Sequence, residues 1–349
     1  MEETQKIIIT DTHFGVRNNS MKFLESQKKL FSQLYDYMLH CENSRFDLIH
    51  LGDLFDSRST VSFYIMSEVK NILLRLNEIL KYRNKENRFI FVAGNHDFYS
   101  PLDDNINSLD TYIRHLLPDA IVVDRYCWYD NGDLYIPWYQ MNDEEKFKLV
   151  QQEALFKEGE LEVRRVFTHT DLKFMQYGKF PVNCSVYSGH IHQYHMYHNM
   201  LSSNPYSLLH NLSTPYSLDF GDSNDNKKGI WLLDGRDLKL IENKDSIKFR
   251  TFVNEEIFDI PDLDEAIERA DNFRIYLTEE NRTRMNYIER INELSTDLKY
   301  VNIILINKEN LNESVTVGSL DIEDMLKEMI PDHIQDCFDT VKKEIHNEE

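Results

Sequence analysis

Short apolar runs alternate with amphipathic stretches over the first 190 residues of the chain. Five runs rich in β-branched residues are typical of buried strands, and they span 6–10, 46–51, 88–93, 164–168 and 184–187. Two of the intervening stretches, 21–41 and 62–82, repeat apolar side chains at helical spacing. Strands that alternate with helices predict an α/β sheet covered on both faces.

The pattern changes after Gly189, where turn residues separate closely spaced strands. These further strands are expected at 208–212, 229–233, 238–241 and 247–253. They predict a second, largely antiparallel sheet that packs against the first.

A domain boundary is expected near Val253. Beyond it, 273–277, 284–294 and 300–306 have the pattern of a strand, a helix and a strand, a small βαβ-like unit. The chain ends in two short amphipathic helices that Pro331 separates. The apolar stripe of the last helix leaves two interpretations open: packing on this same unit, or docking onto a helix of a partner.

The composition excludes several classes of protein. With 349 residues, 41% of them apolar, the chain is long and hydrophobic enough to bury a core and is unlike a disordered protein. No apolar run reaches the length of a membrane helix, and the polar start of the chain does not resemble a secretory signal. The four cysteines lack the spacing of a metal finger, so we expect reduced thiols in an intracellular protein without a membrane partner.

The net charge of −21, from 39 basic and 60 acidic residues, argues against broad contact with phosphates. The charge is unevenly distributed, because residues 254–349 contain 10 basic and 25 acidic side chains and therefore carry −15. The preceding 253 residues carry only −6. A short nucleic-acid site in that first part is therefore compatible with the charge.

Polar clusters directly follow the five strands of the first pattern, where the ligand sites of α/β sheets gather. They are Asp11-Thr12-His13, Gly52-Asp53-Leu54-Phe55-Asp56, Gly94-Asn95-His96-Asp97, His169 and Gly189-His190-Ile191-His192. In extended chain Asp11 and His13 point to the same side and can bind one ion, and the two oxygens of Asp53 can bridge two. Each cluster alone also fits a turn or a polar strand end. The ordered set of five favours a site for two metal ions.

The same motifs resemble the signature of the calcineurin-like metallophosphoesterases. Within that family, about the first 250 residues are similar to the nuclease subunits of double-strand-break repair complexes, the SbcD-like enzymes and the phage recombination endonucleases. The segments that carry this narrower resemblance are 12–16, 53–58, 136–138, 213–216 and 220–222. The resemblance implies an α/β fold, a four-layered α-β-β-α sandwich of two mixed sheets with a small α/β capping domain. It implies a nuclease domain over 1–253, the cap over 254–319 and C-terminal helices over 320–349.

The resemblance also implies the metal ligands. One ion would be held by Asp11, His13, Asp53 and His192. The other would be held by Asp53, Asn95, His169 and His190, with Asp53 between the two. Mixed imidazole and carboxylate ligation suits Mn²⁺, Fe²⁺ or Zn²⁺ better than Mg²⁺, and the resemblance favours Mn²⁺.

Four further residues have expected roles near the metals. His96 should point toward substrate, where it would stabilise the phosphorane-like oxygens or protonate the leaving group. Asp56 should brace a ligand histidine or orient its loop, although many cellular relatives have histidine at this position. Arg17 and Arg58 would contact phosphate from the rim of the site, and a solvated surface role fits them equally well.

The leading hypothesis is a metal-dependent DNA exonuclease and endonuclease subunit that processes DNA ends. The resemblance implies a homodimer and an SMC-like ABC ATPase as partner, and a phage-type enzyme would act in the cytoplasm of an infected host cell. The chain has no GxxxxGK[ST] motif, so ATP dependence would come from that separate subunit. One alternative is a phosphomonoesterase or cyclic-nucleotide phosphodiesterase of the same family. Another is a non-catalytic scaffold, which the complete set of expected ligands argues against.

Overall fold

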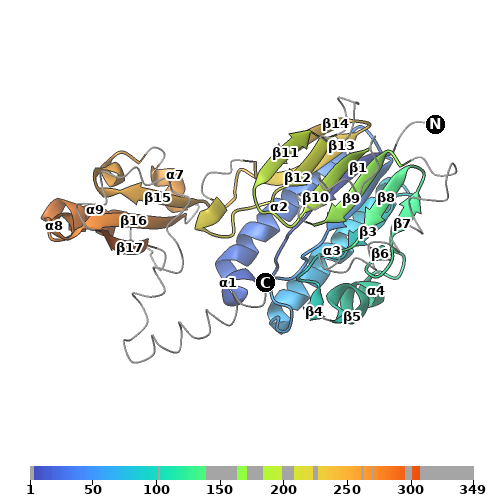
Figure 1. Cartoon of the computed structure of the whole chain (residues 1–349), viewed down its shortest axis with the longest axis horizontal. Coiled ribbons are helices and arrows are strands. Elements are labelled where there is room, and N and C mark those ends of the chain that lie inside the picture. The colour runs from blue at the N-terminus through green and yellow to red at the C-terminus, as the bar shows by residue number, and fades with distance from the viewer. Residues whose placement is uncertain are drawn as a thin grey trace, which may run out of the picture. The chain divides into compact units, whose positions relative to one another are not determined.

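The computed structural model describes residues 4–100, 103–138, 163–170, 184–198, 208–222, 227–260, 263–268, 271–294 and 301–306. The chain divides into two compact units, Met1–Thr251 with Ile260–Arg274, and Phe252–Asp259 with Ile275–Glu349. Figure 1 labels their helices and strands. Every predicted site residue belongs to the first unit.

The first sheet is mixed and has the strand order β14-β13-β1-β2-β3-β6. Its strands are Gln5–Ile9 (β1), Phe46–Leu51 (β2), Phe89–Val92 (β3), Ile121–Val123 (β6), Gly229–Asp234 (β13) and Asp237–Glu242 (β14). Strands β1, β2, β3 and β6 run parallel, whereas β13 is antiparallel to both of its neighbours. The four parallel strands therefore end at the same edge.

The second sheet is also mixed and has the strand order β11-β12-β10-β9-β8-β7. Its strands are Trp128–Asp130 (β7), Asp133–Ile136 (β8), Arg165–His169 (β9), Ser185–Gly189 (β10), Tyr194–His198 (β11) and Leu208–Leu212 (β12). The four central strands are parallel, and an antiparallel strand closes each edge.

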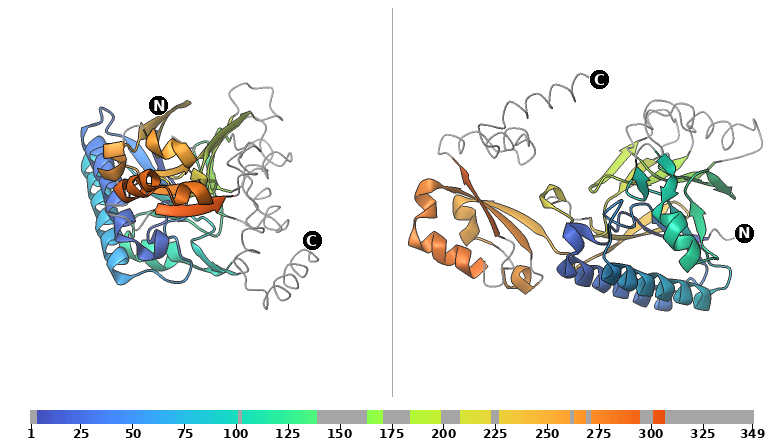
Figure 2. Two further views of the ribbon diagram at one scale, coloured as in Figure 1. Left: turned by 90° about the vertical axis from the view of Figure 1, so that its left-hand side faces the viewer. Right: turned by 90° about the horizontal axis from the view of Figure 1, so that it is seen from below.

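Two long helices, α2 (Met21–His40) and α3 (Phe63–Arg83), lie side by side along one face of the first sheet (Figure 2). Both were predicted from helical spacing, and the Ser62 hydroxyl caps α3 by accepting from the backbone N–H of Ile65 at 3.2 Å. Shorter elements complete the first unit: α1 (Val16–Asn19), β4 (Phe98–Ser100), β5 (Asp103–Asn107), the π-helical turn η1 (Leu109–Ile113), α4 (Arg114–Leu116) and the 3₁₀ turn η3 (Phe220–Asp222).

The alternation of side chains along β1 shows how the layers are made. Ile7 and Ile9 pack with the helices, whereas Ile8 points to the opposite face and packs between the sheets against Phe167 and Tyr187. A third buried cluster, which includes Val166 and Val186, lies on the other face of the second sheet. The described residues thus form a helical layer on two mixed sheets. The fourth, outer helical layer that was expected lies outside the described residues.

The structure corrects the expected division of strands between the sheets. The runs 164–168 and 184–187 were predicted to join the parallel sheet of the first strands, but β9 and β10 form the centre of the second sheet. Conversely, β13 and β14 extend the first sheet through β1. Hydrophobic patterning reports that a strand is buried, but it does not identify the neighbour that completes its hydrogen bonds.

The C-terminal part contains a three-stranded sheet, β15-β16-β17. Its strands are Phe249–Val253 (β15), Asn272–Thr278 (β16) and Val301–Ile306 (β17), and its helical elements are η4 (Asn254–Phe258), α7 (Leu263–Glu268), α8 (Glu279–Arg282) and α9 (Met285–Leu294). The predicted strand, helix and strand are β16, α9 and β17. The run 247–253 was expected in the second sheet, but its residues Phe249–Val253 instead form β15 of this three-stranded sheet. The helices expected over 320–349 lie outside the described residues.

Among the described residues, no helix is both long enough and apolar enough to span a membrane.

Candidate metal centre

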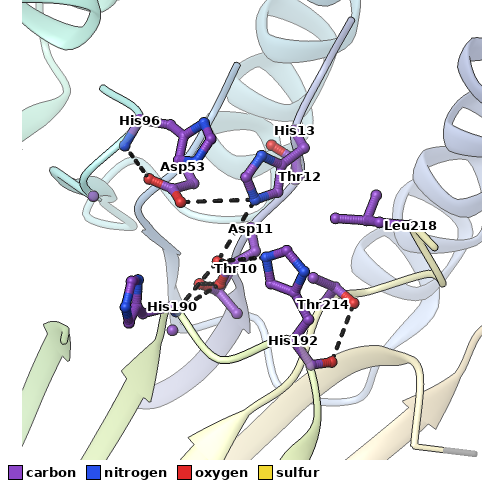
Figure 3. Close-up of polar contacts among 12 residues, drawn as sticks. Thr10, Asp11, Thr12, His13, Asp53, His96, His190, His192, Thr214 and Leu218 are labelled. Carbon is purple, nitrogen blue, oxygen red and sulfur yellow. Dashed lines mark hydrogen bonds and ion pairs between the residues drawn. The ribbon is translucent and has the colours of Figure 1, made fainter. Parts of the chain in front are cut away.

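The loops that follow β1, β2, β3, β9 and β10 meet at the carboxyl ends of the two sheets (Figure 3). His169, the last residue of β9, donates a 2.7 Å hydrogen bond from Nδ1 to the carbonyl of Leu51 at the end of β2. The backbone N–H of His190 donates to both carboxylate oxygens of Asp11, each at 3.2 Å. Both contacts cross from one sheet to the other, so the centre forms only when the sheets pack together.

The backbone of the centre adopts an uncommon conformation. Four ligand candidates have positive φ angles: Asp11 at 50°, His13 at 40°, Asp53 at 56° and His190 at 87°. Non-glycine residues rarely occupy this region, and they remain there only where the surrounding structure holds them. Here the N–H of Asp11 donates to the Gly52 carbonyl and that of His13 to the Asp53 carbonyl, each at 3.0 Å.

Glycines let the loops approach one another beneath the ligands. A Cβ at Gly94 would lie 2.3 Å from Asp53 Oδ1, and a Cβ at Gly189 would lie 2.1 Å from Thr10 Oγ1. Neither residue has a positive φ, so the requirement is for space rather than for a turn. Gly52 combines both needs, because its φ is 86° and a Cβ there would lie 2.5 Å from His169 Nδ1.

Five of the predicted ligands, together with His96, supply three overlapping groups of atoms, and the atoms of each group lie within 4.8 Å of one another. The groups are Asp11 with His13 and His192, Asp11 with Asp53 and His169, and His13 with Asp53 and His96. Asp11 and Asp53 each belong to two groups, and both are buried. Carboxylates shared between groups are the arrangement that two adjacent cations require.

Asn95 connects the remaining predicted ligands. Its Oδ1 accepts hydrogen bonds of 3.0 Å from Nε2 of His169 and from Nδ1 of His190. Nε2 of His169 also lies 3.3 Å from Oδ2 of Asp53. The four residues expected around the second ion are therefore linked by direct contacts.

The surroundings of His13 test whether this donor set fits a metal ion. Its Nε2 lies 3.8 Å from Asp11 Oδ1 and 3.7 Å from Asp53 Oδ2, both beyond hydrogen-bonding distance. This nitrogen is buried and has no hydrogen-bond partner among the residues that the structure describes. A buried imidazole left without a partner between two buried carboxylates leaves a place for a cation, and the donor set fits a divalent metal.

The pKa values show how strongly the centre attracts positive charge. Burial disfavours the charged carboxylates, yet His169 and His13 hold the pKa of Asp53 at about 2, and His169, His13 and His192 hold that of Asp11 well below its usual range. Burial likewise lowers the pKa of His13, but Asp11, Asp56 and Asp53 outweigh it and raise that pKa to about 10. The carboxylates also raise the pKa of His169 against its burial, to about 9. Protons here supply the positive charge that metal ions would otherwise bring.

Residues 6–194, more than half of the chain, match the family model described as calcineurin-like phosphoesterase. The chain belongs to the calcineurin-like phosphoesterase family. This family uses divalent metal ions, which agrees with the three groups of ligand atoms, and its members are hydrolases of phosphate esters. The match spans all seven predicted ligands.

Individual relatives match this phosphoesterase only in part. A stretch of 100 residues is 32% identical to the DNA double-strand break repair protein Mre11 of Sulfurisphaera tokodaii, covering 28% of this chain and 23% of that protein. The chain therefore matches less than a quarter of that relative's length. The structure of the nuclease MPE of Pseudomonas putida is 16% identical, with a TM-score of 0.28, over 54% of this chain and 62% of that one. A protein of unknown function from Aquifex aeolicus is 17% identical, with a TM-score of 0.26, over 54% and 80%.

His96 and Asp56 lie beside His13 in this phosphoesterase. The ring centroids of His96 and His13 are 4.8 Å apart, so His96 lies among the candidate ligands and not apart from them. Nδ1 of His96 donates to the Asp56 carbonyl at 2.5 Å, which leaves Nε2 available to substrate. Asp56 Oδ1 lies 3.3 Å from His13 Nδ1. Asp56 thus contacts both histidines, as a bracing residue would.

The two arginines differ in their contacts. The guanidinium of Arg17 donates from Nε and Nη2 to the carbonyl of Leu218, at 3.2 and 3.1 Å. These hydrogen bonds within the protein occupy two of its donor nitrogens. Arg58 is half-buried and makes no hydrogen bond or ion pair within the described part of the chain, so its charge stays available to an anion.

Asp97 has a structural role that we did not assign from the sequence, although it ends the Gly94-Asn95-His96-Asp97 motif. Its buried carboxylate accepts from the backbone N–H groups of Gly94 at 2.8 Å and Asp53 at 2.9 Å. It also accepts from the hydroxyl of Ser108 at 2.9 Å. Burial, followed by the charge of Asp53, raises the pKa of Asp97 to about 6. Asp97 ties the second loop to the third and so positions Asp53.

The loop that carries His192 is held by residues that no motif identified. The side-chain amide of Asn211 donates to the carbonyls of Ile191 at 2.6 Å and Gln193 at 2.5 Å. The ammonium of Lys228 donates to the carbonyl of His192 itself, at 2.6 Å. Three consecutive carbonyls are thus anchored from outside the loop.

Proposed function

We propose that the chain is a two-metal DNA nuclease that hydrolyses phosphodiester bonds at DNA ends. The observation that carries the proposal is the pair of buried carboxylates, Asp11 and Asp53, each shared between groups of ligand atoms. The similarity of one segment to a double-strand-break repair protein favours DNA over other phosphate esters. We further propose Mn²⁺ as the metal, because mixed imidazole and carboxylate donors suit it.

The proposed ligand roles are those that the resemblance implies, and the contacts described above are compatible with them. Asp11, His13, Asp53 and His192 would hold one ion, and Asp53, Asn95, His169 and His190 the other. When bound, two divalent ions supply Lewis-acid polarisation of the scissile phosphate and activation of the attacking water. Asp56 and Asp97 position His13 and Asp53 through the hydrogen bonds and contacts described above.

His96 is the candidate for proton transfer. Attack by water at phosphorus forms one P–O bond and breaks the bond to the leaving oxygen, which must gain a proton. Because Nδ1 of His96 is engaged by the Asp56 carbonyl, Nε2 is the atom that can donate to that oxygen. Arg58 is the proposed phosphate contact, whereas the guanidinium of Arg17 is hydrogen-bonded to the carbonyl of Leu218.

The proposed domains and partners are those that the family resemblance implies. We propose a nuclease domain over 1–253, a capping domain over 254–319 and a partner-binding segment over 320–349. The subunit would dimerise and act with an SMC-like ABC ATPase, as the resemblance implies. ATP dependence would come from that ATPase, since this chain contains no GxxxxGK[ST] motif.

The test compares DNA with small esters on the purified chain. End-labelled duplex and single-stranded DNA, p-nitrophenyl phosphate, bis-p-nitrophenyl phosphate and cyclic AMP are each incubated with Mn²⁺ or Mg²⁺, with EDTA as the metal-free control. The proposal expects degradation of DNA that depends on Mn²⁺. Hydrolysis of small esters with intact DNA would instead indicate a phosphomonoesterase or cyclic-nucleotide phosphodiesterase.

A further inference from the structure

Lys228 places a charged ammonium directly behind the loop of His192. Its side chain is 5% exposed. Besides the carbonyl of His192 at 2.6 Å, the ammonium contacts the hydroxyls of Thr214 at 2.8 Å and Ser213 at 3.2 Å. Thr214 lies beside His192 in Figure 3 and also donates to its carbonyl, at 3.4 Å. The carbonyl of one candidate ligand is therefore the focus of a buried polar cluster.

Asp222 neutralises this ammonium and extends the cluster. Its Oδ1 lies 3.1 Å from the Lys228 nitrogen, and its Oδ2 accepts from the backbone N–H of Leu218 at 2.8 Å. The carbonyl of Leu218 in turn accepts from the guanidinium of Arg17, four residues after His13. A continuous series of contacts thus connects the loop after β10 with the loop after β1.

His192 depends on such an anchor more than its expected partners at the same ion do. Its side chain is 34% exposed, whereas those of Asp11, His13 and Asp53 are at most 2% exposed. Packing therefore contributes less to holding its ring near Asp11, where Nε2 lies 4.0 Å from Oδ1. A buried ammonium is costly unless its hydrogen bonds and counter-charge are complete. Here one of these hydrogen bonds goes to the carbonyl of His192, which the Ser213 hydroxyl also holds at 2.8 Å.

We propose that Lys228 is a positioning residue for His192 and thereby controls occupancy of the metal site that His192 shares with Asp11 and His13. The inference rests on the proposed two-metal function. The other ion would be held by Asp53, Asn95, His169 and His190, none of which belongs to the polar cluster around Lys228 described above, so that ion should be retained when Lys228 is replaced. Loss of the ammonium should therefore convert a two-metal centre into a one-metal centre.

The experiment counts Mn²⁺ bound to the full chain, by metal analysis after desalting and by electron paramagnetic resonance. The wild-type chain should hold two ions with a spin-coupled signal. Lys228→Met, which keeps the aliphatic stem, should hold one ion with an uncoupled signal, and the second should bind at least tenfold more weakly. The matched control is Lys227→Met, because Lys227 is an exposed neighbour of the same charge whose ammonium lies 4.0 Å from the Tyr194 ring centroid.

Lys228→Met leaves the buried Asp222 carboxylate without its counter-charge, and this could unfold the protein. A second variant is therefore needed to separate the positioning of His192 from folding. Lys228→Met/Asp222→Asn removes both charges and keeps an acceptor for the N–H of Leu218. The inference expects this folded double variant, checked by circular dichroism and thermal melting, still to hold one ion. Two coupled ions in either variant would overturn the role of Lys228. Fewer than two ions in the wild-type chain would instead overturn the proposed function.

Discussion

His13 lies between carboxylates on both sides of its ring. One ring nitrogen faces Asp56, and the other faces Asp11 and Asp53 at distances that suit a shared ion and not a hydrogen bond. His96 packs edge-on against the same ring. The chemistry of the site therefore depends on one imidazole whose partners come from three separate loops.

Replacement of His96 should separate catalysis from metal binding. His96→Ala should lower kcat by about 10²- to 10⁴-fold, because the leaving oxygen loses its proton donor, while the number of bound Mn²⁺ ions is unchanged. The measurements are DNA turnover and Mn²⁺ titration on the same preparation. His195→Ala, at an exposed histidine of β11, is the matched control and should retain both. Parallel loss of turnover and metal in His96→Ala would show that His96 is a ligand.

Mn²⁺ binding should release protons at pH 7.5. With pKa values of about 10 and 9, His13 and His169 are protonated in the metal-free chain, whereas a ligand histidine must be neutral. Apparent affinity should therefore rise with pH up to about pH 9–10, where these groups lose their protons unaided. Titration calorimetry in buffers of different ionisation enthalpy measures the protons released. A heat that does not depend on the buffer would contradict the charge state assigned here.

At the scale of elements, the two sheets are joined by charge at the amino ends of their strands, opposite to the metal centre. Lys6 at the start of β1 contacts Asp47 of β2 at 2.7 Å and Asp133 of β8 at 3.1 Å. Arg165 of β9 binds Asp133 with two hydrogen bonds, of 2.6 and 3.0 Å. These side chains are nearly fully buried, so each charge needs its partner.

Removal of Asp133 should therefore destabilise the packing of the two sheets without affecting the metal site. Asp133→Ala leaves Arg165 and Lys6 buried with incomplete partners and should lower the free energy of unfolding by about 3–5 kcal/mol. Urea denaturation measures this loss. The comparison is Asp237→Ala, which breaks the exposed Lys239 pair and should leave the free energy of unfolding nearly unchanged, because solvent screens that pair. An equal loss of unfolding free energy in the two variants would refute the importance of the buried network. Both variants should still bind the same number of Mn²⁺ ions as the wild-type chain.

At the scale of the whole chain, the uneven charge limits how the DNA substrate proposed above could bind. Residues 1–253 carry −6 and the rest carry −15, while two divalent ions would bring +4 to a centre where Asp11 and Asp53 supply −2. A phosphate is thus attracted locally, at the metals, in an acidic protein. Extended contact with the DNA backbone would have to come from a second subunit or a partner.

The isolated chain should accordingly bind DNA weakly, with a shallow dependence on salt. Few phosphates are neutralised, so few counterions are released. Fluorescence anisotropy of labelled duplex DNA between about 50 and 200 mM salt, with Ca²⁺ in place of Mn²⁺ to prevent cleavage, gives the slope. We expect the affinity to change by less than about tenfold over that range. A change of 10³-fold or more would reveal an extensive basic surface on this chain.

The sequence alone determined the phosphoesterase family of this protein, its candidate ligands and its local structure. The ligand types, their order after successive strands, helices α2 and α3, and the strand–helix–strand pattern of the C-terminal part are short-range features. They depend on periodicity and on neighbouring residues, which a single chain displays directly.

Only the tertiary structure decided which strands share a sheet and which residues hold the ligands in place. β9 and β13 exchanged their expected sheets because a buried strand has the same pattern whichever neighbour it pairs with. Asp97, Asn211 and Lys228 act through hydrogen bonds to backbone groups of distant loops, and such contacts need no motif. Gly94 and Gly189 resemble turn residues in the sequence, yet they are required because side chains from distant loops occupy the space of a Cβ. These are long-range contacts, and they exist only once the two sheets have packed.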